Sequence, residues 1–375
     1  MADADTRLMT RALEIAREGD PSPNPHVGAI LADGERVLAE RFHEAAGLEH
    51  AEGAVLREVG EQAKGKTLYV TLEPCNHEGR TAPCVDAILS AGVARVVIGC
   101  RDPNPHVVGG GVERLREAGV DVVVGVMERE AKALIRPWTK FITEASSYLS
   151  LKLAVSLDGR IATRTGVSKW ITGPDARLRV QQLRSTRDAV MVGINTIVAD
   201  DPGLSVRDVP GRSPARVVID SKLRLSRSSQ VVASAADIPT CVVTTTEASR
   251  PLAEALEECG VALIRVPATA EGRCDMSAAL RELAAREAVS VLCEGGSELA
   301  GSLLAAGLVD ELHVFVAPLL LGPRGRPGAI DWAGPENPSE APKIVDPHWE
   351  LCGDDAYVSG LVVYPRKVPR PASGG

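Results

Sequence analysis

The sequence predicts two α/β domains that follow one another along the chain. Its length of 375 residues exceeds what a single hydrophobic core usually fills. Short apolar runs suited to buried strands alternate with segments of helical period through both halves, and this alternation predicts sheets covered by helices. The alternation restarts near Ser146. We therefore place one domain at residues 1–145, a second at 146–365, and a tail at 366–375 that we expect to be disordered.

In the first half, we expect strands at residues 27–31, 37–41, 67–72, 95–98 and 120–124. Asp33 and Gly34 mark a hairpin turn between the first two strands, because Asp-Gly readily adopts the positive φ angles of a tight hairpin. Helices are expected near residues 8–16, 50–56, 85–90, 110–117 and 129–144. The last of these leads into the second half.

In the second half, we expect strands at residues 148–155, 189–192, 215–219, 240–244, 261–266 and 289–293. A helix at 174–184 carries Pro174 in its first turn, where a missing N–H costs nothing, and another helix is expected at 298–305. Residues 312–316 and 356–363 are expected to close the sheet as antiparallel strands. No internal repeat relates the two halves.

Composition argues against several classes of protein. A formal net charge of −8 without any block of Lys or Arg argues against a nucleic-acid partner. The first 17 residues lack the apolar stretch of a secretory signal, and no apolar run is long enough to span a bilayer. Eight cysteines spread over the chain do not form a disulfide framework. We expect a cytoplasmic protein with a small-molecule partner and no membrane contact.

The strongest chemical signal is a set of metal-ligating residues. His50 and Glu52 are separated by one residue, Cys75 follows Pro74, and Cys84 comes after eight intervening residues. One imidazole and two thiolates suit Zn²⁺, and three protein ligands leave the fourth tetrahedral position open to water. Bound zinc lowers the pKa of that water to about 7, and Glu52 is placed to carry its proton to a leaving ammonia. This pattern predicts a hydrolytic deaminase that acts on a pyrimidine-type ring.

Alternatives to this catalytic zinc site remain open. A structural zinc would need a fourth protein ligand, for which His77 is the candidate. Chance proximity is disfavoured because Glu52 and Pro74 also fit the pattern. His313 and His348 are interpreted as structural or exposed. The remaining cysteines show no ligand spacing and are interpreted as small apolar residues: Cys100, Cys241, Cys259, Cys274, Cys293 and Cys352.

The second half carries a weaker signal of its own. No G-x-G-x-x-G motif follows a strand, so a Rossmann dinucleotide site is not predicted. Glu294, Gly295 and Gly296 instead separate an expected strand from an expected helix. Glycines let a backbone approach a phosphate, and a helix N-terminus offers free N–H groups to it. Glycine pairs at such places are often only turns, so both interpretations stay open.

Motifs along most of the chain carry a resemblance to a known family. In the first half they are Pro-Asn-Pro at 23–25, Val-Gly at 27–28, His-Ala-Glu at 50–52, Thr-Leu-Glu-Pro-Cys at 71–75, Gly-Arg-Thr at 79–81, Pro-Cys at 83–84 and Asp-Pro-Asn-Pro at 102–105. In the second half they are Lys152, Ser-Leu-Asp-Gly at 156–159, Ala-Asp-Asp-Pro at 199–202, Arg207, Glu-Gly-Gly at 294–296 and Gly-Leu-Val-Asp-Glu at 307–311. Together these motifs resemble the bifunctional riboflavin-biosynthesis deaminase–reductase family.

The resemblance implies a cytidine-deaminase-like α/β/α domain joined to a dihydrofolate-reductase-like α/β domain. The first domain would use Zn²⁺ to deaminate 2,5-diamino-6-ribosylamino-4(3H)-pyrimidinone 5′-phosphate. The second would use NADPH to reduce the ribosyl group of 5-amino-6-(5-phosphoribosylamino)uracil to ribityl. A homo-oligomer is expected. Two alternatives are a paralogous deaminase of a related pyrimidine or pteridine with an altered or inactive reductase half, and a non-catalytic binding protein braced by zinc.

The resemblance also implies roles for individual residues in the second half. Cofactor positions are Ala154, Trp170, Thr196, Asp200, Ser221, Gly296, Ser297, Glu298, Leu299, Ala300, Gly301 and Ser302. Substrate positions are Ser168, Arg184, Leu204, Arg207 and Glu294. Arg184 and Arg207 suit a phosphate because a guanidinium makes bidentate hydrogen bonds, although surface ion pairs are the alternative. No catalytic acid of the reductase half is identified.

Three of the positions that depart from the family's pattern bear on substrate preference. Glu78, Ala82 and Gly110 stand where His, Pro and Lys are usual. None of them is a metal ligand, so the departures leave the reaction type intact and put substrate preference in question.

Overall fold

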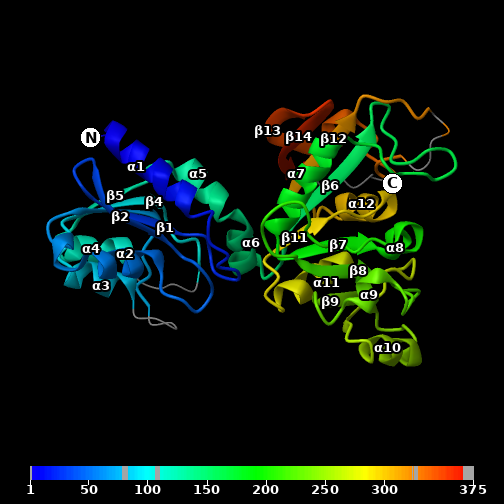
Figure 1. Cartoon of the computed structure of the whole chain (residues 1–375), viewed down its shortest axis with the longest axis horizontal. Helices are drawn as coiled ribbons and strands as arrows, with labels where there is room; N and C mark the ends of the chain where they lie inside the picture. The colour runs from blue at the N-terminus through cyan, green and yellow to red at the C-terminus, as the bar shows by residue number, and fades with distance from the viewer. Residues whose placement is uncertain (1, 78–82, 106–109, 323, 325–327, 366–375) are drawn as a thin grey trace, which may run out of the picture. The chain divides into compact units, whose positions relative to one another are not determined.

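The chain forms two compact units, Met1–Ser146 and Ser147–Gly375, and each contains its own sheet. The computed structural model describes residues 2–77, 83–105, 110–322, 324 and 328–365 (Figure 1). The division falls one residue from the boundary expected at 145/146. The expected tail at 366–375 lies outside the described residues.

The first unit is built on a five-stranded mixed sheet in the order β2-β1-β3-β4-β5. Its strands are β1 (Gly28–Asp33), β2 (Arg36–Phe42), β3 (Thr67–Leu72), β4 (Arg95–Cys100) and β5 (Asp121–Val124). β1 and β2 form the predicted hairpin, in which Gly34 adopts a φ of +60°. β3, β4 and β5 are parallel, so their carboxyl ends open at one edge of the sheet.

Helices cover both faces of this sheet. α1 (Ala2–Ile15) and α5 (Glu128–Leu134) lie on one face, and α2 (Ala51–Val59), α3 (Cys84–Ser90) and α4 (Gly111–Glu117) lie on the other (Figure 1). A short 3₁₀ helix spans Gly60–Ala63. Strands covered on both faces are apolar almost throughout, which explains the fully buried runs in β3 and β4. The cytidine-deaminase-like α/β/α expectation is confirmed.

The prediction of a single helix at 129–144 was wrong. Two helices occupy this stretch, α5 and α6 (Arg136–Glu144), and they meet at Ile135, whose φ and ψ of −96° and 8° leave the helical region. Pro137 lies in the first turn of α6 and has no N–H to donate to the preceding turn. A helix can begin at such a residue but cannot run continuously through it.

A buried ion pair fastens α1 to the sheet. The Arg95 guanidinium donates to both carboxylate oxygens of Asp5, at 2.9 and 2.8 Å, and the Tyr69 hydroxyl donates to Asp5 Oδ1 at 2.8 Å. The Arg95 guanidinium holds the pKa of Asp5 below its usual value, against the opposing effect of burial. Bidentate pairs of this kind are the strong class of charged hydrogen bonds.

Asp5→Asn should lower the free energy of unfolding by about 1–3 kcal/mol, because one oxygen and the charge that face Arg95 are lost. Since the pKa of Asp5 is depressed, its contribution is complete above about pH 4 and disappears as the pH falls through the lower folded-state pKa. Urea unfolding at pH 7 measures the difference in the free energy of unfolding between the wild type and the variant. Asp3→Asn is the matched control, because Asp3 is exposed in the same first helical turn. Equal losses in the two variants would contradict the prediction.

The second unit is built on a nine-stranded sheet in the order β10-β9-β8-β7-β11-β6-β12-β14-β13. The strands are β6 (Tyr148–Ser156), β7 (Ala189–Gly193), β8 (Ala215–Ile219), β9 (Thr240–Thr245), β10 (Ala262–Val266), β11 (Ser290–Cys293), β12 (Glu311–Ala317), β13 (Lys343–Cys352) and β14 (Asp355–Val363). Every neighbouring pair from β10 to β12 is parallel.

The direction expected for residues 312–316 was wrong in part. β12 runs parallel to β6 and is antiparallel only to β14. The chain reaches β12 from β11 through a helix, and such a crossover returns the next strand in the parallel direction. β13 was not expected, because Pro347 and several polar residues interrupt its pattern. The strand tolerates them because it is an edge strand with an irregular register between Val345 and His348.

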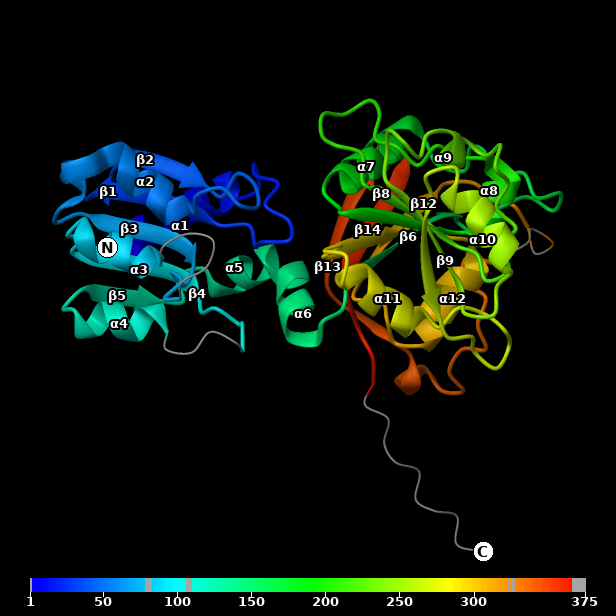
Figure 2. The same cartoon turned by 90° about the horizontal axis from the view of Figure 1, so that it is seen from below.

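Helices again lie on both faces. One face carries α7 (Pro174–Ser185), α8 (Ile194–Asp200), α9 (Gln230–Ala233) and α10 (Arg250–Glu257), and the other carries α11 (Met276–Ala284) and α12 (Ser297–Ala305) (Figure 2). A short 3₁₀ helix spans Pro338–Glu340. The dihydrofolate-reductase-like expectation is confirmed. Within the described residues, every helix is too short or too polar to cross a membrane.

Candidate active sites

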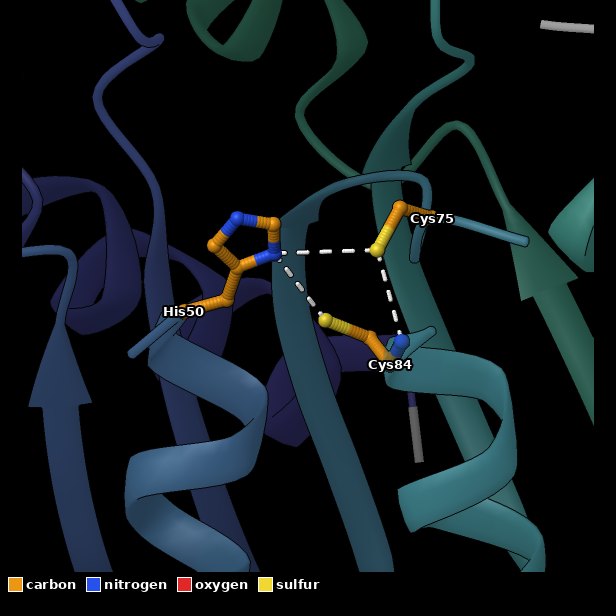
Figure 3. A group of neighbouring side chains, drawn as sticks. All are labelled: His50, Cys75 and Cys84. Carbon is orange, nitrogen blue, oxygen red and sulfur yellow. Dashed lines mark hydrogen bonds between the residues drawn. The ribbon is translucent and has the colours of Figure 1, made fainter. Parts of the chain in front are cut away.

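Three ligand side chains converge in the first unit. His50 caps the start of α2, Cys75 follows β3, and Cys84 is the first residue of α3. His50 Nδ1 lies 3.2 Å from Cys84 Sγ and 3.6 Å from Cys75 Sγ (Figure 3). The three ligand atoms all lie within 4.8 Å of one another. The loop from β3 to α3 thus brings the two cysteines, separated by eight residues, to one imidazole.

These distances fit a zinc ion. Zn–N bonds of about 2.05 Å and Zn–S bonds of about 2.3 Å at a tetrahedral angle place the nitrogen and sulfur about 3.6 Å apart. Among the residues that the structure describes, this is the one cluster of His, Cys, Asp or Glu able to hold a metal. His77 is exposed and is not part of the cluster. Three protein ligands leave a coordination position for water, as a catalytic zinc requires.

The two thiols are electrostatically unlike. Hydrogen bonds from the Cys84 side chain and from His50 lower the pKa of Cys75 to about 4, and the Cys84 N–H donates to Cys75 Sγ at 3.3 Å. The hydrogen bond to Cys75 and burial raise the pKa of the Cys84 thiol. The pair therefore holds one thiolate readily, and a bound dication would stabilise the second.

Glu52 follows the ligand His50 by two residues and lies in the first turn of α2. Its carboxyl is buried, 4% exposed, and reaches the Cys84 side chain. Burial raises the pKa of Glu52, and the charge of His50 offsets only part of that effect. A carboxyl with a raised pKa can accept a proton and release it again near neutral pH.

His43 also contributes to this site, and the sequence alone did not single it out. Its Nδ1 lies 3.1 Å from the Glu49 carbonyl and its Nε2 lies 3.0 Å from Asn24 Nδ2. Nδ1 must therefore donate and Nε2 must accept, which describes a neutral ring. Burial lowers the pKa of His43 and keeps it neutral. The ring stands edge-on to His50 at 5.3 Å. Asn24 was visible within the Pro-Asn-Pro motif, whereas His43 has no flanking signal.

A large cavity of about 1560 Å³ opens in the second unit. It lies at the carboxyl ends of β6, β11, β7 and β8. The predicted cofactor and substrate residues that line it are Ala154, Ser168, Trp170, Arg184, Thr196, Asp200, Leu204, Arg207, Ser221, Glu294, Gly296, Ser297, Glu298, Leu299 and Ser302. Ala300 and Gly301 are the predicted cofactor residues that do not line it. Ala300 belongs to the core, and a Cβ at Gly301 would lie 1.9 Å from the Asp331 carbonyl oxygen.

Comparisons with known proteins identify the family. The RibD C-terminal domain family matches residues 147–358, and the cytidine and deoxycytidylate deaminase zinc-binding region matches residues 2–100. The riboflavin biosynthesis protein RibD of Aquifex aeolicus is 42% identical over 85% of this chain and 88% of its own length. That of Escherichia coli is 41% identical over 91% of this chain and 94% of its own.

The chain belongs to the RibD family. The solved structure of Acinetobacter baumannii RibD has a TM-score of 0.84 at 34% identity and covers 97% of this chain and 100% of its own. As a RibD, the protein is a bifunctional enzyme of riboflavin biosynthesis, with a zinc-dependent deaminase domain and an NADPH-dependent reductase domain. Zn²⁺ and NADPH are the cofactors of these two domains.

Two cations surround a buried carboxylate in the reductase cavity of this RibD. Arg184 Nη2 donates to Glu294 Oε2 at 3.0 Å, and Lys152 Nζ lies 3.9 Å from the same oxygen. Burial opposes ionisation of Glu294, but Arg184 and Lys152 outweigh it and hold its pKa below the usual value. Burial lowers the pKa of Lys152, and Glu294 offsets part of that effect. Arg184 was expected to bind a phosphate, yet its guanidinium is already engaged by Glu294.

The start of α12 suits the pyrophosphate of NADPH. Gly296 caps the helix without any side-chain hydrogen bond to its first N–H groups. A Cβ placed on Gly296 would meet nothing within 4 Å, so the backbone is open toward the cavity. Free helix N–H groups beside a glycine are the usual seat of such an anion.

Near the zinc cluster, Glu73 shapes the neighbouring backbone. Its carboxylate accepts the N–H groups of Asp102 at 3.2 Å and Val112 at 3.1 Å. A cavity of about 210 Å³ lies beside it and includes Gly110. A Cβ at Gly110 would lie 2.1 Å from Glu113 Oε2. A larger residue here would therefore displace Glu113. The other two departures, Glu78 and Ala82, lie outside the described residues.

Arg216 is a buried residue that sequence reasoning missed. It is 1% exposed, and its guanidinium donates to the carbonyl oxygens of Gly203 at 3.2 Å, Val231 at 3.0 Å and Ile238 at 2.9 Å. Carbonyl dipoles thus take the place of a carboxylate partner. Because Gly203 and Leu204 line the cavity, Arg216 holds that part of the wall in place although it does not line the cavity itself.

Arg216→Lys should raise the KM of the reductase reaction for its pyrimidine substrate about fivefold, the factor that corresponds to one lost hydrogen bond of about 1 kcal/mol. Its kcat should change less, because Arg216 does not itself line the cavity and acts only through the backbone that it holds. Steady-state kinetics give both constants. Arg265→Lys is the matched control, since that exposed arginine also donates to a carbonyl, at Ala248. A fall in kcat with an unchanged KM would rule out the positioning role.

Proposed function

We propose that this chain deaminates 2,5-diamino-6-ribosylamino-4(3H)-pyrimidinone 5′-phosphate and then reduces 5-amino-6-(5-phosphoribosylamino)uracil to the ribitylamino product. The convergence of His50, Cys75 and Cys84 beside a buried Glu52 supports the first step most directly. The solved Thermotoga maritima relative is described as a diaminohydroxyphosphoribosylaminopyrimidine deaminase and 5-amino-6-(5-phosphoribosylamino)uracil reductase, and it has a TM-score of 0.84 at 34% identity.

In the deaminase site, His50, Cys75 and Cys84 would hold the zinc ion, which supplies hydroxide at neutral pH. Glu52 would take the proton of the attacking water and pass it to the leaving amine. Its raised pKa supports this role, because the group must hold the proton between the two transfers. Neutral His43 and Asn24 would present hydrogen-bonding groups beside the metal without adding charge.

In the reductase site, NADPH supplies the hydride and the protein orients the two partners. Hydride addition to the first sugar carbon needs a proton on the ring oxygen as that carbon–oxygen bond opens. We assign this proton to Lys152, which lines the cavity as a buried ammonium with a lowered pKa. Glu294 would keep Lys152 protonated before hydride transfer. Exposed Arg207, which also lines the cavity, would bind the substrate phosphate.

Two variants test the assignment reciprocally. Glu52→Gln should reduce ammonia release from the diaminopyrimidine phosphate about 100-fold or more, since general acid–base catalysis contributes on that scale. It should still oxidise NADPH when supplied with the deaminated compound. Lys152→Met should release ammonia normally and lose NADPH oxidation. Ammonia release and NADPH absorbance are followed together in zinc-loaded protein.

Glu58→Gln is the matched control for Glu52→Gln, because Glu58 lies on the exposed face of the same helix and pairs with Arg41. Metal analysis of each variant checks that the zinc remains. Ammonia release without NADPH oxidation in the wild type would favour the paralogous deaminase. Unchanged ammonia release in Glu52→Gln would contradict the role of Glu52, and a wild type that neither releases ammonia nor oxidises NADPH would favour the zinc-braced binding protein.

We also propose a homo-oligomer that assembles over the outer strand β13. Trp349 and Leu351 are 68% and 76% exposed and lie two residues apart, so they share one face of the strand. The side chain between them, Glu350, pairs with Arg179 of α7 on the opposite face. An apolar edge of this kind invites pairing unless something covers it, and a second copy is the partner we expect.

The double variant Trp349→Glu/Leu351→Glu should elute as a monomer when the wild type elutes as an oligomer. Light scattering coupled to size-exclusion chromatography gives the mass directly. Leu252→Glu, at an exposed leucine on α10, is the control for an added surface charge and should keep the wild-type mass. A wild-type monomer, or an oligomer that survives the double substitution, would disprove assembly at this edge.

A further inference from the structure

Three basic side chains gather at the β8 end of the reductase cavity. Lys222 and Arg224 follow β8, and Arg273 lies in the segment between β10 and α11. One contact joins the two segments. The Cys274 N–H donates to Ser221 Oγ at 3.0 Å, and that hydroxyl donates to Cys274 Sγ at 3.3 Å. Each of the three cations is thus within three residues of a single fixed contact.

The segment after β8 is built to turn its cations outward. Leu223 and Leu225 are buried, with exposed fractions of 4% and 6%. Lys222, which precedes Leu223, and Arg224, which lies between the two leucines, are exposed. The Asp220 carboxylate is buried beneath the segment and accepts the Leu225 N–H at 2.8 Å. The other carboxylate oxygen, Oδ1, is buried without a hydrogen-bond partner, so neither oxygen forms a hydrogen bond with the three cations.

The three cations form no direct ion pair among the described residues, although the charges of Asp220 and Glu271 act on Arg224 and Arg273 from a greater distance. Arg224 Nη2 donates to the neutral Asn195 side chain at 2.8 Å. Within the described residues, no carboxylate forms an ion pair with Lys222, Arg224 or Arg273. Glu271 lies two residues before Arg273, and its carboxylate accepts the Thr269 hydroxyl at 2.8 Å. Unpaired cations lining a cavity attract an anionic group of the molecule that enters it.

The order of the strands places this cluster at one end of a bound dinucleotide. Lys152 and Glu294 mark the reacting end at β6 and β11, and the open start of α12 follows β11. β7 and then β8 come next in the sheet, so β8 lies about 10 Å beyond β11. A dinucleotide with its nicotinamide at Lys152 and its pyrophosphate at Gly296 extends its adenosine half toward β8. NADPH differs from NADH only in a phosphate on that adenosine.

We propose that Lys222, Arg224 and Arg273 bind the 2′-phosphate of NADPH and thereby select NADPH over NADH. The inference rests on the proposed reductase function, specifically on binding of the NADPH pyrophosphate at Gly296. Two loops supply the cations, and their Ser221–Cys274 contact holds the cluster in place before the cofactor arrives.

Direct binding tests the proposal. Calorimetry with the zinc-loaded full chain gives the Kd of NADPH, NADH and 2′-AMP. Lys222→Gln/Arg224→Gln should raise the Kd of NADPH at least about tenfold, leave that of NADH within about twofold, and abolish detectable binding of 2′-AMP. Arg250→Gln is the matched control, because Arg250 is exposed on α10 and pairs with Glu254 away from the cavity. It should bind all three ligands as the wild type does.

Arg273→Gln lies on the separate segment and tests the proposal independently if the double variant does not fold. It should also raise the Kd of NADPH and leave that of NADH unchanged. Equal weakening of NADPH and NADH, or no weakening of NADPH, would overturn the assignment while leaving the reductase function standing. A wild type that binds neither dinucleotide would overturn the proposed cofactor-binding site and this inference together.

Discussion

Parallel strand pairing is the constraint on which both sites depend. In a parallel sheet the carboxyl ends of neighbouring strands meet at one edge, and the segments that leave them converge there. β3 delivers Cys75 to such an edge in the first unit, where the starts of α2 and α3 supply His50 and Cys84. β6, β7, β8 and β11 open together on the reductase cavity in the second unit. Each site is therefore assembled from short segments whose positions the sheet determines.

Two buried glutamates show how the surroundings assign different tasks to one residue type. Glu52 has only partial compensation from His50, so burial dominates and its pKa rises. Glu294 lies between Arg184 and Lys152, which outweigh the effect of burial and lower its pKa. The first carboxyl is suited to carrying a proton and the second to remaining an anion. The same logic explains why Lys152, and not Glu294, is the better proton donor in the reductase cavity.

The parts of the fold and site that local sequence determines were predictable. The strands of the first unit follow from apolar runs, and the zinc ligands follow from residue type and spacing. The direction of β12 could not be inferred, because it depends on the crossover through α12 and not on its own residues. The break before α6 had a local signal in Pro137 that the helical period outweighed. Arg216 and His43 gave no signal, since their importance arises from backbone carbonyls and side chains distant in sequence.

The residues that the structure describes at each active site belong to a single unit. The zinc cluster and Glu52 belong wholly to Met1–Ser146, and every residue that lines the large cavity belongs to Ser147–Gly375. Each unit also has its own hydrophobic core. The two reactions are then linked by chemistry, because the deaminated pyrimidine is the compound that the reductase accepts. A substitution at one site should consequently alter the flux through the other only by changing how much intermediate is made or consumed.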